Sequence, residues 1–159
     1  HMENKEVVDI DEATIKISAA VQSRTSNEFL IAARTDSRAT HGLDEALRRG
    51  EAFLSAGADI LFIEAPQSIE EMQTIKKEFP ETPLIANMVE GGKTPELSVK
   101  ELEKLGFKIV LRPVTALLST ADTLRRCYSS LSDESAAGSP PPMLSFDEYN
   151  EMIGLPDYD

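Results

Sequence analysis

The 159-residue sequence is poor in the residues that build disulfides, zinc sites and nucleic-acid surfaces. Its single cysteine, Cys127, excludes an internal disulfide, and its two histidines, His1 and His41, are far apart. Only 16 lysines and arginines stand against 28 acidic residues, which gives a formal net charge of −12. Without a basic stripe to neutralise phosphates, we expect neither nucleic acid nor an anionic membrane surface as a partner.

Long apolar runs and recognisable signal sequences are also lacking, so the sequence predicts no membrane-spanning helix. We expect a cytoplasmic protein, or a plastid protein if the source is a plant. The phosphate-binding patterns GxGxxG and GxxxxGK do not occur. An apolar fraction of 41% over 159 residues indicates one globular domain, or a piece of one.

The most informative stretch runs from Pro83 to Pro95 and reads PLIANMVEGGKTP. It opens with a short apolar run, typical of a buried strand, and becomes polar around Gly91 and Gly92. Strands that end in a polar, glycine-containing loop carry the active sites of α/β barrels and of open α/β sheets. The alternative is an ordinary connection between a strand and a helix.

Apolar patterns predict four strands that alternate with helices. The predicted strands are continuous apolar runs, which indicate strands covered on both faces, and they span 29–33, 58–63, 83–87 and 107–111. The predicted helices span 9–23, 43–54, 69–79, 98–105, 115–131 and 145–153. This alternation predicts an α/β fold with a parallel sheet, either a small doubly wound sheet or half of an eight-stranded barrel.

Helix-capping signals support several of these boundaries. Either Asp9 or Asp11 can cap the first helix, and Arg24 closes it. Ser68 followed by Glu71 has the pattern of a capping box, in which each residue's side chain accepts from the other's backbone amide.

Each of the four predicted strands ends in, or is followed by, polar residues. They are Arg34-Thr35-Asp36, Glu64, Asn87 and Arg112. Because the carboxyl ends of parallel strands share one rim, we expect these side chains to converge. Arg34 can bind a carboxylate through two hydrogen bonds, Glu64 can serve as an ionised partner or a base, and Asn87 can donate to a second carboxylate or an enolate oxygen. The alternative is that Arg34 and Glu64 form a buried ion pair that serves the fold.

At these positions the chain resembles the isocitrate lyase/phosphoenolpyruvate mutase superfamily. The matching segments are IAARTD (31–36), GLDEAL (42–47), AGAD (56–59), FIEA (62–65), ANMVEGGKTP (86–95), LGFK (105–108) and PVTAL (113–117). MIG (152–154) and Tyr158 resemble the C-terminal helix of that superfamily. The VEGG form at 89–92 is closer to 2,3-dimethylmalate lyases, oxaloacetate hydrolases, petal-death-type proteins and carboxyphosphonoenolpyruvate mutases than to isocitrate lyase.

The resemblance implies that the chain is the C-terminal half, strands five to eight, of a (β/α)8 TIM barrel. Residues 1–131 would form the half-barrel, 132–144 a flexible proline-rich linker, and 145–159 a C-terminal helix swapped between subunits of a dimer, within a dimer of dimers. The magnesium-binding aspartates of the superfamily, and its catalytic cysteine in a Lys-x-Cys-Gly-His loop, belong to the first half. We therefore expect a magnesium cofactor whose ligands lie outside this chain, with no metal ligand within it.

The function implied by the resemblance is a magnesium-dependent lyase that breaks a C–C bond in a small 2-hydroxy or 2-oxo dicarboxylate, through an enolate. Arg34, Glu64 and Asn87 would be catalytic. Substrate would be bound by Arg34, Asn87, Pro113 and His1, with Pro113 at the pocket floor. Alone, the chain is expected to be inactive, and its partners are the N-terminal half and further copies. The alternatives are a phosphonomutase acting on a phosphoenolpyruvate analogue, and a non-catalytic half-barrel that serves assembly.

His1 has two interpretations. His1-Met2 matches the remnant of a cleaved purification tag. It also matches the end of the superfamily's catalytic loop, where Gly-His is followed four residues later by a lysine, here Lys5. The lysine spacing and the match at Val7-Val8-Asp9 favour a native segment, so the chain is expected to begin inside that loop.

Overall fold

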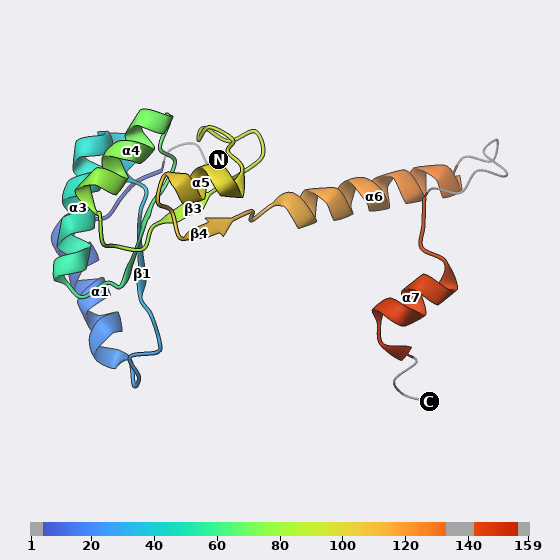
Figure 1. Ribbon diagram of the computed structural model, residues 1–159, viewed down its shortest axis with the longest axis horizontal. Helices are drawn as coiled ribbons and strands as arrows, with labels where there is room; N and C mark the ends of the chain where they lie inside the picture. The colour runs from blue at the N-terminus through green and yellow to red at the C-terminus, as the bar shows by residue number, and fades with distance from the viewer. Residues whose placement is uncertain (1–4, 133–141, 156–159) are drawn as a thin grey trace. The chain divides into compact units, whose positions relative to one another are not determined.

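The computed structural model describes residues 5–132 and 142–155. The chain divides into two compact units, His1–Thr115 and Ala116–Asp159, and each is described by itself. The elements, shown in Figure 1, are α1 (Ile10–Ser23), β1 (Ala32–Thr35), α2 (Ser37–His41), α3 (Leu43–Ser55), β2 (Ile60–Ile63), α4 (Ile69–Glu78), β3 (Ile85–Asn87), α5 (Val99–Lys104), β4 (Ile109–Leu111), α6 (Thr115–Ser132) and α7 (Phe146–Met152). Among the described helices, none has the length and apolar character needed to cross a membrane.

The strands of the first unit are parallel and follow one another in chain order. β1 pairs with β2, with Arg34 opposite Phe62, and β3 pairs with β4, with Asn87 opposite Leu111. A single isolated bridge between Leu61 and Leu84 joins the two pairs. The parallel α/β arrangement predicted from the alternating pattern is therefore confirmed, and all four strands have their carboxyl ends on the same side.

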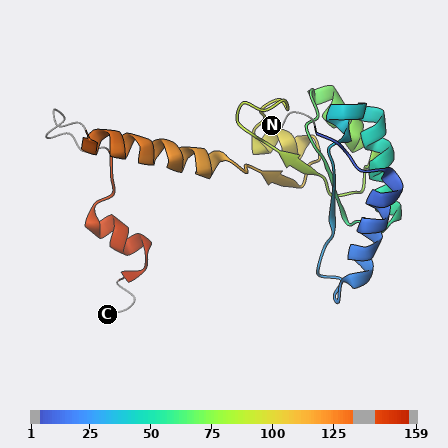
Figure 2. The same ribbon diagram turned by 180° about the vertical axis from the view of Figure 1, so that it is seen from behind.

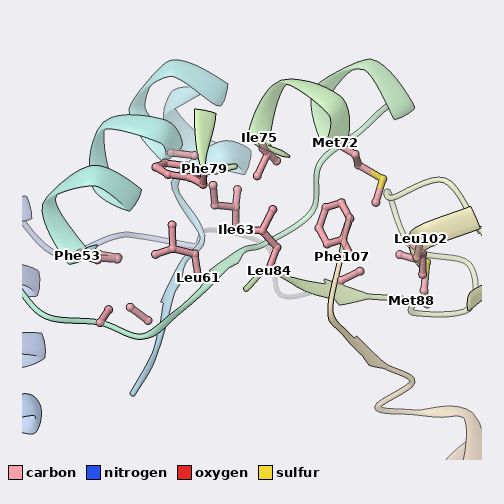
Figure 3. Close-up of a cluster of buried hydrophobic side chains, with 14 of the residues drawn as sticks. Phe53, Leu61, Ile63, Met72, Ile75, Phe79, Leu84, Met88, Leu102 and Phe107 are labelled. Atoms are coloured by element: carbon pink, nitrogen blue, oxygen red, sulfur yellow. The ribbon is translucent and has the colours of Figure 1, made fainter. Parts of the chain in front are cut away.

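The main hydrophobic core lies between the strands and the helices that connect them. Figure 2 shows the helices from behind, and Figure 3 shows the core side chains that they cover. Strand residues Leu61, Ile63 and Leu84 meet Phe53 of α3 and Ile75 of α4, each at most 5% exposed. Side chains alternate along a strand, so these positions face the helices and their neighbours face the other way.

The opposite side of the strands carries a second, smaller apolar cluster. It contains Ile60, Phe62 and Ile85, with Ile109 partly buried against them. This arrangement explains why every residue of β2 is buried, as the continuous apolar run predicted. The same alternation places the polar residues at the strand ends, described below, on this side.

The first predicted strand, 29–33, is wrong in position. β1 begins at Ala32, and the side chains of Phe29 and Leu30 are 65% and 55% exposed. The amide of Ile31 donates to the carboxylate of Asp59 at 2.8 Å, while its carbonyl oxygen accepts from the amide of Ile60 at 3.2 Å. Exposed and buried positions then alternate along β1, which shows that one face is covered and not two.

Capping predictions were confirmed where they depended on neighbouring residues alone. Asp9 caps α1, and its side chain accepts from the Asp11 amide at 2.8 Å, while Arg24 follows the last helical residue. At α4, Ser68 accepts from the Glu71 amide, but the Glu71 carboxylate accepts from the Gln67 amide and from Arg38. The predicted capping box is therefore only half formed, because an arginine distant in sequence attracts the carboxylate.

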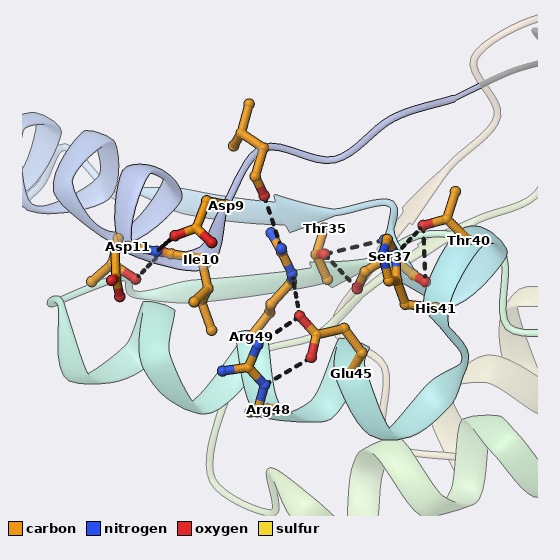
Figure 4. A network of polar contacts seen from close by, with 12 residues as sticks. Asp9, Ile10, Asp11, Thr35, Ser37, Thr40, His41, Glu45, Arg48 and Arg49 are labelled. Carbon is orange, nitrogen blue, oxygen red and sulfur yellow. Dashed lines mark hydrogen bonds and ion pairs between the residues drawn. The ribbon is translucent and has the colours of Figure 1, made fainter.

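The segment before α1 is fastened to α3 by a group of charged side chains, shown in Figure 4. Arg49 is 6% exposed, and its Nη2 donates to the carbonyl oxygen of Val8 at 2.8 Å. Its Nε donates to Glu45 at 2.8 Å, and Arg48 donates to the same carboxylate at 2.7 and 2.9 Å. Led by the hydrogen bond from Arg48, this pairing lowers the pKa of Glu45 to about 2.

The second unit contains α6 beyond its first residue, and α7. Every residue of both helices is at least partly exposed, and Phe146 of α7 has an exposed fraction of 88%. Ser145 and Glu148 form a complete capping box at the start of α7, within the predicted helix 145–153. The predicted domain boundaries and the helix swap stay predictions. Most of the predicted linker, and Tyr158, lie outside the described residues.

Candidate active site

Side chains from three of the four predicted strand ends come together, because Arg34 and Asn87 both approach the carboxylate of Glu64. Glu64 directly follows β2, and its side chain is only 8% exposed. The Asn87 Nδ2 lies 3.3 and 3.5 Å from its two oxygens, and the Arg34 Nη2 lies 3.6 Å from its Oε2. Strand alternation places all three on the side away from the helices. The fourth, Arg112, lies 3.9 Å from Glu90 and 4.0 Å from Glu96.

Asp36 is the strongest partner of Arg34. Its Oδ1 accepts from the Arg34 Nε at 2.6 Å and its Oδ2 accepts from Nη2 at 3.1 Å, a two-point pairing. Lys5 donates to the same Oδ2 at 2.7 Å. Burial tends to raise the pKa of Asp36, but the hydrogen bonds from Arg34 and Lys5 outweigh it, and the pKa falls below its ordinary value.

This geometry bears on the alternative in which Arg34 and Glu64 form a buried ion pair. The Arg34 side chain is 45% exposed, and its contact with Glu64 is longer than its contacts with Asp36. Its guanidinium carbon lies 4.8 Å from the centre of the Phe62 ring, a cation–π contact. The hydrogen bond to Asp36 is the main cause that raises the pKa of Arg34. In this chain Arg34 is therefore a partly exposed cation whose chief partner is Asp36.

A small cavity adjoins Glu64 and Asn87. It is also lined by Ala65, Gly92 and Lys93, and its volume of about 10 Å³ is the space of one water molecule. The Asn87 Oδ1 is buried and has no hydrogen-bond partner among the described residues. Because the amide nitrogen of Asn87 faces Glu64, its oxygen can accept a hydrogen bond from a ligand or a water molecule.

Ala65 adopts a left-handed backbone conformation at the centre of the site. Its φ of 56° is the only positive value outside glycine in the described residues, and its side chain is 8% exposed. Such a conformation costs a residue with a β-carbon about 1 kcal/mol and occurs mostly at functional sites. Ala65 directly follows Glu64 and lines the same small cavity.

The loop after β3 contacts Thr115, the first residue of α6. Glu90 accepts a hydrogen bond from the Thr115 hydroxyl, which is the main cause that lowers the pKa of Glu90. Pro113, predicted to form the pocket floor, is exposed and does not line the small cavity. Its substrate-binding role stays a prediction. His1, the other predicted substrate-binding residue, lies outside the described residues.

Metal ligands are not grouped in the described part of the chain. Within residues 5–132 and 142–155, no group of three or more histidine, cysteine, aspartate or glutamate residues could hold an ion. Glu64 with Asn87 supplies too few charged oxygens for a magnesium site on its own. The described residues therefore do not fit a self-contained magnesium centre.

Sequence reasoning missed three contributors to this site: the pairing of Asp36 with Arg34, the salt bridge from Lys5, and the Phe62 ring. The first had a signal, because residues two apart on a strand face the same side. Arg34 and Asp36 have that spacing at the end of β1. The long-range contact of Lys5 had no comparable signal in the sequence.

Comparison with known proteins agrees with this arrangement of strand ends. The model of the phosphoenolpyruvate phosphomutase family matches residues 1–131. The chain belongs to the phosphoenolpyruvate phosphomutase family. Among relatives in this family, the 2,3-dimethylmalate lyase of Eubacterium barkeri is 44% identical over 98% of this chain and 54% of its own length. The petal death protein of Dianthus caryophyllus is 37% identical over 98% of this chain and 49% of its own length.

Solved structures of the family share the fold. A trigonal crystal form of 2,3-dimethylmalate lyase, a PEP mutase/isocitrate lyase superfamily member, superposes with a TM-score of 0.88 at 32% identity, over 99% of this chain and 53% of that one. The structure of oxaloacetate acetylhydrolase in complex with the inhibitor 3,3-difluorooxalacetate superposes with a TM-score of 0.88 at 29% identity, over 99% of this chain and 54% of that one. The chain spans about half the length of the curated relatives it matches. The resemblance read from the strand-end motifs is thus confirmed.

Proposed function

We propose that this chain is the C-terminal part of a lyase that breaks a C–C bond in a small 2-hydroxy or 2-oxo dicarboxylate. The observation that carries the proposal is the convergence of Arg34 and Asn87 on the buried Glu64, at the carboxyl ends of parallel strands. Relatives named as lyases of 2,3-dimethylmalate and 2-methylisocitrate, 44% and 41% identical, support it. The substrate class is of the 2-alkylmalate, methylisocitrate or oxaloacetate type.

The proposed architecture is strands five to eight of a (β/α)8 barrel. It is supported by the chain-order parallel strands and by the TM-score of 0.88 over about half of a longer structure. The partner that completes the barrel is then an N-terminal half. We further propose a dimer of dimers in which α7 is exchanged between subunits, because apolar residues such as Phe146 and Met152 are exposed on this helix.

The proposed reaction uses the three converging side chains in different ways. Arg34 binds one carboxylate of the substrate, and Asn87 binds the far carboxylate. Glu64 accepts the proton of the substrate hydroxyl, or orients that hydroxyl toward an acid supplied by the N-terminal half. When the C–C bond of a 2-hydroxy substrate breaks, the hydroxyl carbon becomes a carbonyl, and the bonding electrons pass to the departing carboxylate fragment as an enolate. A 2-oxo substrate first adds water to its carbonyl, and the hydrated carbon then becomes a carboxyl group as the same bond breaks. That enolate then takes up a proton to complete the products.

Magnesium belongs to this proposal as a cofactor held outside the described residues. When bound, the ion would neutralise charge on the substrate oxygens and the enolate. The described residues do not form its site, so the steps above are assigned to side chains of this chain alone. His1 and Pro113 complete the proposed substrate contacts.

One observation favours a second reaction. The chloroplastic carboxyvinyl-carboxyphosphonate phosphorylmutase of Arabidopsis thaliana is 34% identical over 98% of this chain and 47% of its own length. The same cluster of Arg34, Glu64 and Asn87 suits an anionic phosphonate as well as a dicarboxylate. Phosphonomutase chemistry on a phosphoenolpyruvate analogue is therefore the alternative. A non-catalytic half-barrel that serves assembly is the third.

The test begins with the intact mass of the purified protein and of anything that co-purifies with it. Turnover is then measured with 2,3-dimethylmalate, 2-methylisocitrate and oxaloacetate, in the 159-residue chain and in a protein that joins it to an N-terminal half. We expect magnesium-dependent formation of a 2-oxo acid or oxalate in the joined protein, and none in the chain alone. Formation of a C–P bond from a phosphoenolpyruvate analogue, without lyase turnover, would favour the phosphonomutase.

A substitution at Glu64 tests whether this residue is the base of the proposed reaction. Glu64→Gln keeps the shape of the side chain and removes the base, so we expect kcat to fall by at least about a hundredfold with little change in KM. Glu12→Gln, which removes an exposed carboxylate of α1, is the matched control and should leave both constants unchanged. Full activity of the Glu64→Gln protein would refute the assignment of Glu64 as base.

A further inference from the structure

Asp36 pairs with Arg34 at the site but has no role in the proposed reaction. An arginine guanidinium has two edges that can bind a carboxylate through two hydrogen bonds, one formed by Nε with Nη2 and the other by Nη1 with Nη2. Asp36 occupies the first edge at 2.6 and 3.1 Å. Within the described residues, Nη1 makes no hydrogen bond, and the Oε2 of Glu64 lies 3.6 Å from Nη2, beyond hydrogen-bond distance, so the second edge can still donate to a ligand.

We propose that Asp36 is a positioning residue for Arg34: it holds the inner edge of the guanidinium and thereby presents the Nη1–Nη2 edge to a substrate carboxylate. This proposal rests on the proposed function, because the ligand that it assigns to the Nη1–Nη2 edge is the carboxylate of the proposed substrate. Phe62 supports the same orientation, since its ring lies 4.8 Å from the guanidinium carbon. Two independent contacts thus fix a side chain that is otherwise long and flexible.

Asp36 is itself held from a second direction. Lys5 donates to its Oδ2 at 2.7 Å, and both side chains are largely buried, at 29% and 22% exposure. The segment that carries Lys5 is fastened three residues later, where Arg49 donates to the carbonyl oxygen of Val8. The orientation of Arg34 therefore depends on the segment before α1, through a chain of charged contacts that begins on α3.

Loss of the pairing between Asp36 and Arg34 should weaken ligand binding, which loss of an ordinary surface ion pair would not do. An Asp36→Asn protein keeps the size of the side chain but loses the charge that attracts both cations. Arg34 then rotates among several orientations, and a dicarboxylate must restrict that motion when it binds. The loss appears in ligand affinity and in the dynamics of one guanidinium, while the strands that carry the site remain as they are.

Two measurements test the proposal. The first is the exchange of the Arg34 Nε–H with water, followed by nitrogen-15 NMR in the 159-residue chain. We expect exchange about tenfold faster in Asp36→Asn than in wild type, the effect of losing a charge-assisted hydrogen bond, with an intermediate rate in Asp36→Glu. Equal exchange in wild type and Asp36→Asn would overturn the proposal.

The second measurement is calorimetric titration with 2-methylmalate as the probe, in the chain joined to an N-terminal half. We expect Asp36→Asn to bind about tenfold more weakly than wild type and Asp36→Glu to recover part of the loss. Asp122→Asn is the matched control, because Asp122 also pairs with two basic residues, Arg125 and Arg126, and it should bind as wild type does.

The outcomes separate the two proposals. If 2-methylmalate binds the wild type and Asp36→Asn equally well, the positioning role is refuted and the proposed function stands. If 2-methylmalate does not bind the wild type, the dicarboxylate function fails, and with it the ligand assigned to the presented edge. A urea unfolding curve of Asp36→Asn that matches the wild type shows that any loss of affinity comes from Arg34 and not from unfolding.

Discussion

Replacing Gly50 with alanine tests how closely the helices behind the site are packed. Gly50 lies in the middle of α3, and a β-carbon there would stand 2.7 Å from Cζ and 3.1 Å from Cε2 of Phe79. It would also stand 3.3 Å from Cδ1 of Leu61. Carbon atoms in proteins approach to about 3.5–4.0 Å, so the Phe79 ring must move by roughly 1 Å. Phe79 and Leu61 are 4% and 1% exposed, which leaves little space for that movement.

Two opposing effects set the magnitude. Alanine is favoured over glycine inside a helix by about 1 kcal/mol, which would stabilise the variant. Overpacking a filled core costs about 1–3 kcal/mol. We therefore expect Gly50→Ala to lower the free energy of unfolding by about 1 kcal/mol, measured by urea denaturation with circular dichroism. Glu51→Ala, at the exposed neighbouring position, is the control and should change stability by a few tenths of a kcal/mol.

A double-mutant cycle identifies the contact responsible. In a Phe79→Leu background the aromatic ring edge is gone, so Gly50→Ala should lose most of its cost there. The reasoning would be refuted if Gly50→Ala alone raised stability by about 1 kcal/mol, as helix propensity by itself predicts. The outcome also concerns the site, because α3 follows the strand of Arg34 and α4 follows the strand of Glu64.

Three further predictions follow from the structure. Glu45 has a pKa of about 2, below its ordinary 4.5, so its contribution to the free energy of unfolding is complete above about pH 4.5 and is lost toward pH 2. Glu45→Gln should remove this acid sensitivity, which urea unfolding curves taken across this pH range would measure. The contribution is at most about 1 kcal/mol, because the pair is screened by solvent. Leu61→Ala should lower the free energy of unfolding by about 2–5 kcal/mol, because this side chain is fully buried in the core. Asn87→Asp places a second carboxylate about 3.5 Å from Glu64 and should weaken calorimetric binding of 2-methylmalate at pH 7 at least tenfold, because the added negative charge repels the dicarboxylate.

Local signals in the sequence predicted local structure well. The capping residues Asp9 and Ser68 stand where the pattern placed them, because a cap depends on residues within one turn of the helix. The convergence of Arg34, Glu64 and Asn87 was also predictable, because parallel strands put their carboxyl ends together.

What the sequence did not predict depends on contacts between distant residues. An apolar run shows that a strand is near but not where it begins, and at β1 the amide of the preceding Ile31 is bound by a residue 28 positions later, Asp59. The five-residue helix α2, Ser37–His41, lies between the predicted strand 29–33 and the predicted helix 43–54, where no helix was predicted. The left-handed conformation of Ala65 had no signal in the sequence, because glycine is the residue that usually indicates this conformation and alanine rarely adopts it.

The single bridge between Leu61 and Leu84 has a consequence for how the site responds to a ligand. Each strand pair shares a ladder of several residues, whereas β2 and β3 are joined at one point. A sheet yields first where it has fewest hydrogen bonds, so small openings concentrate at this joint. Glu64 and Asn87 stand on either side of it. The contact between the Glu64 carboxylate and the Asn87 amide, at 3.3 and 3.5 Å, therefore lies across the part of the sheet with the fewest main-chain hydrogen bonds.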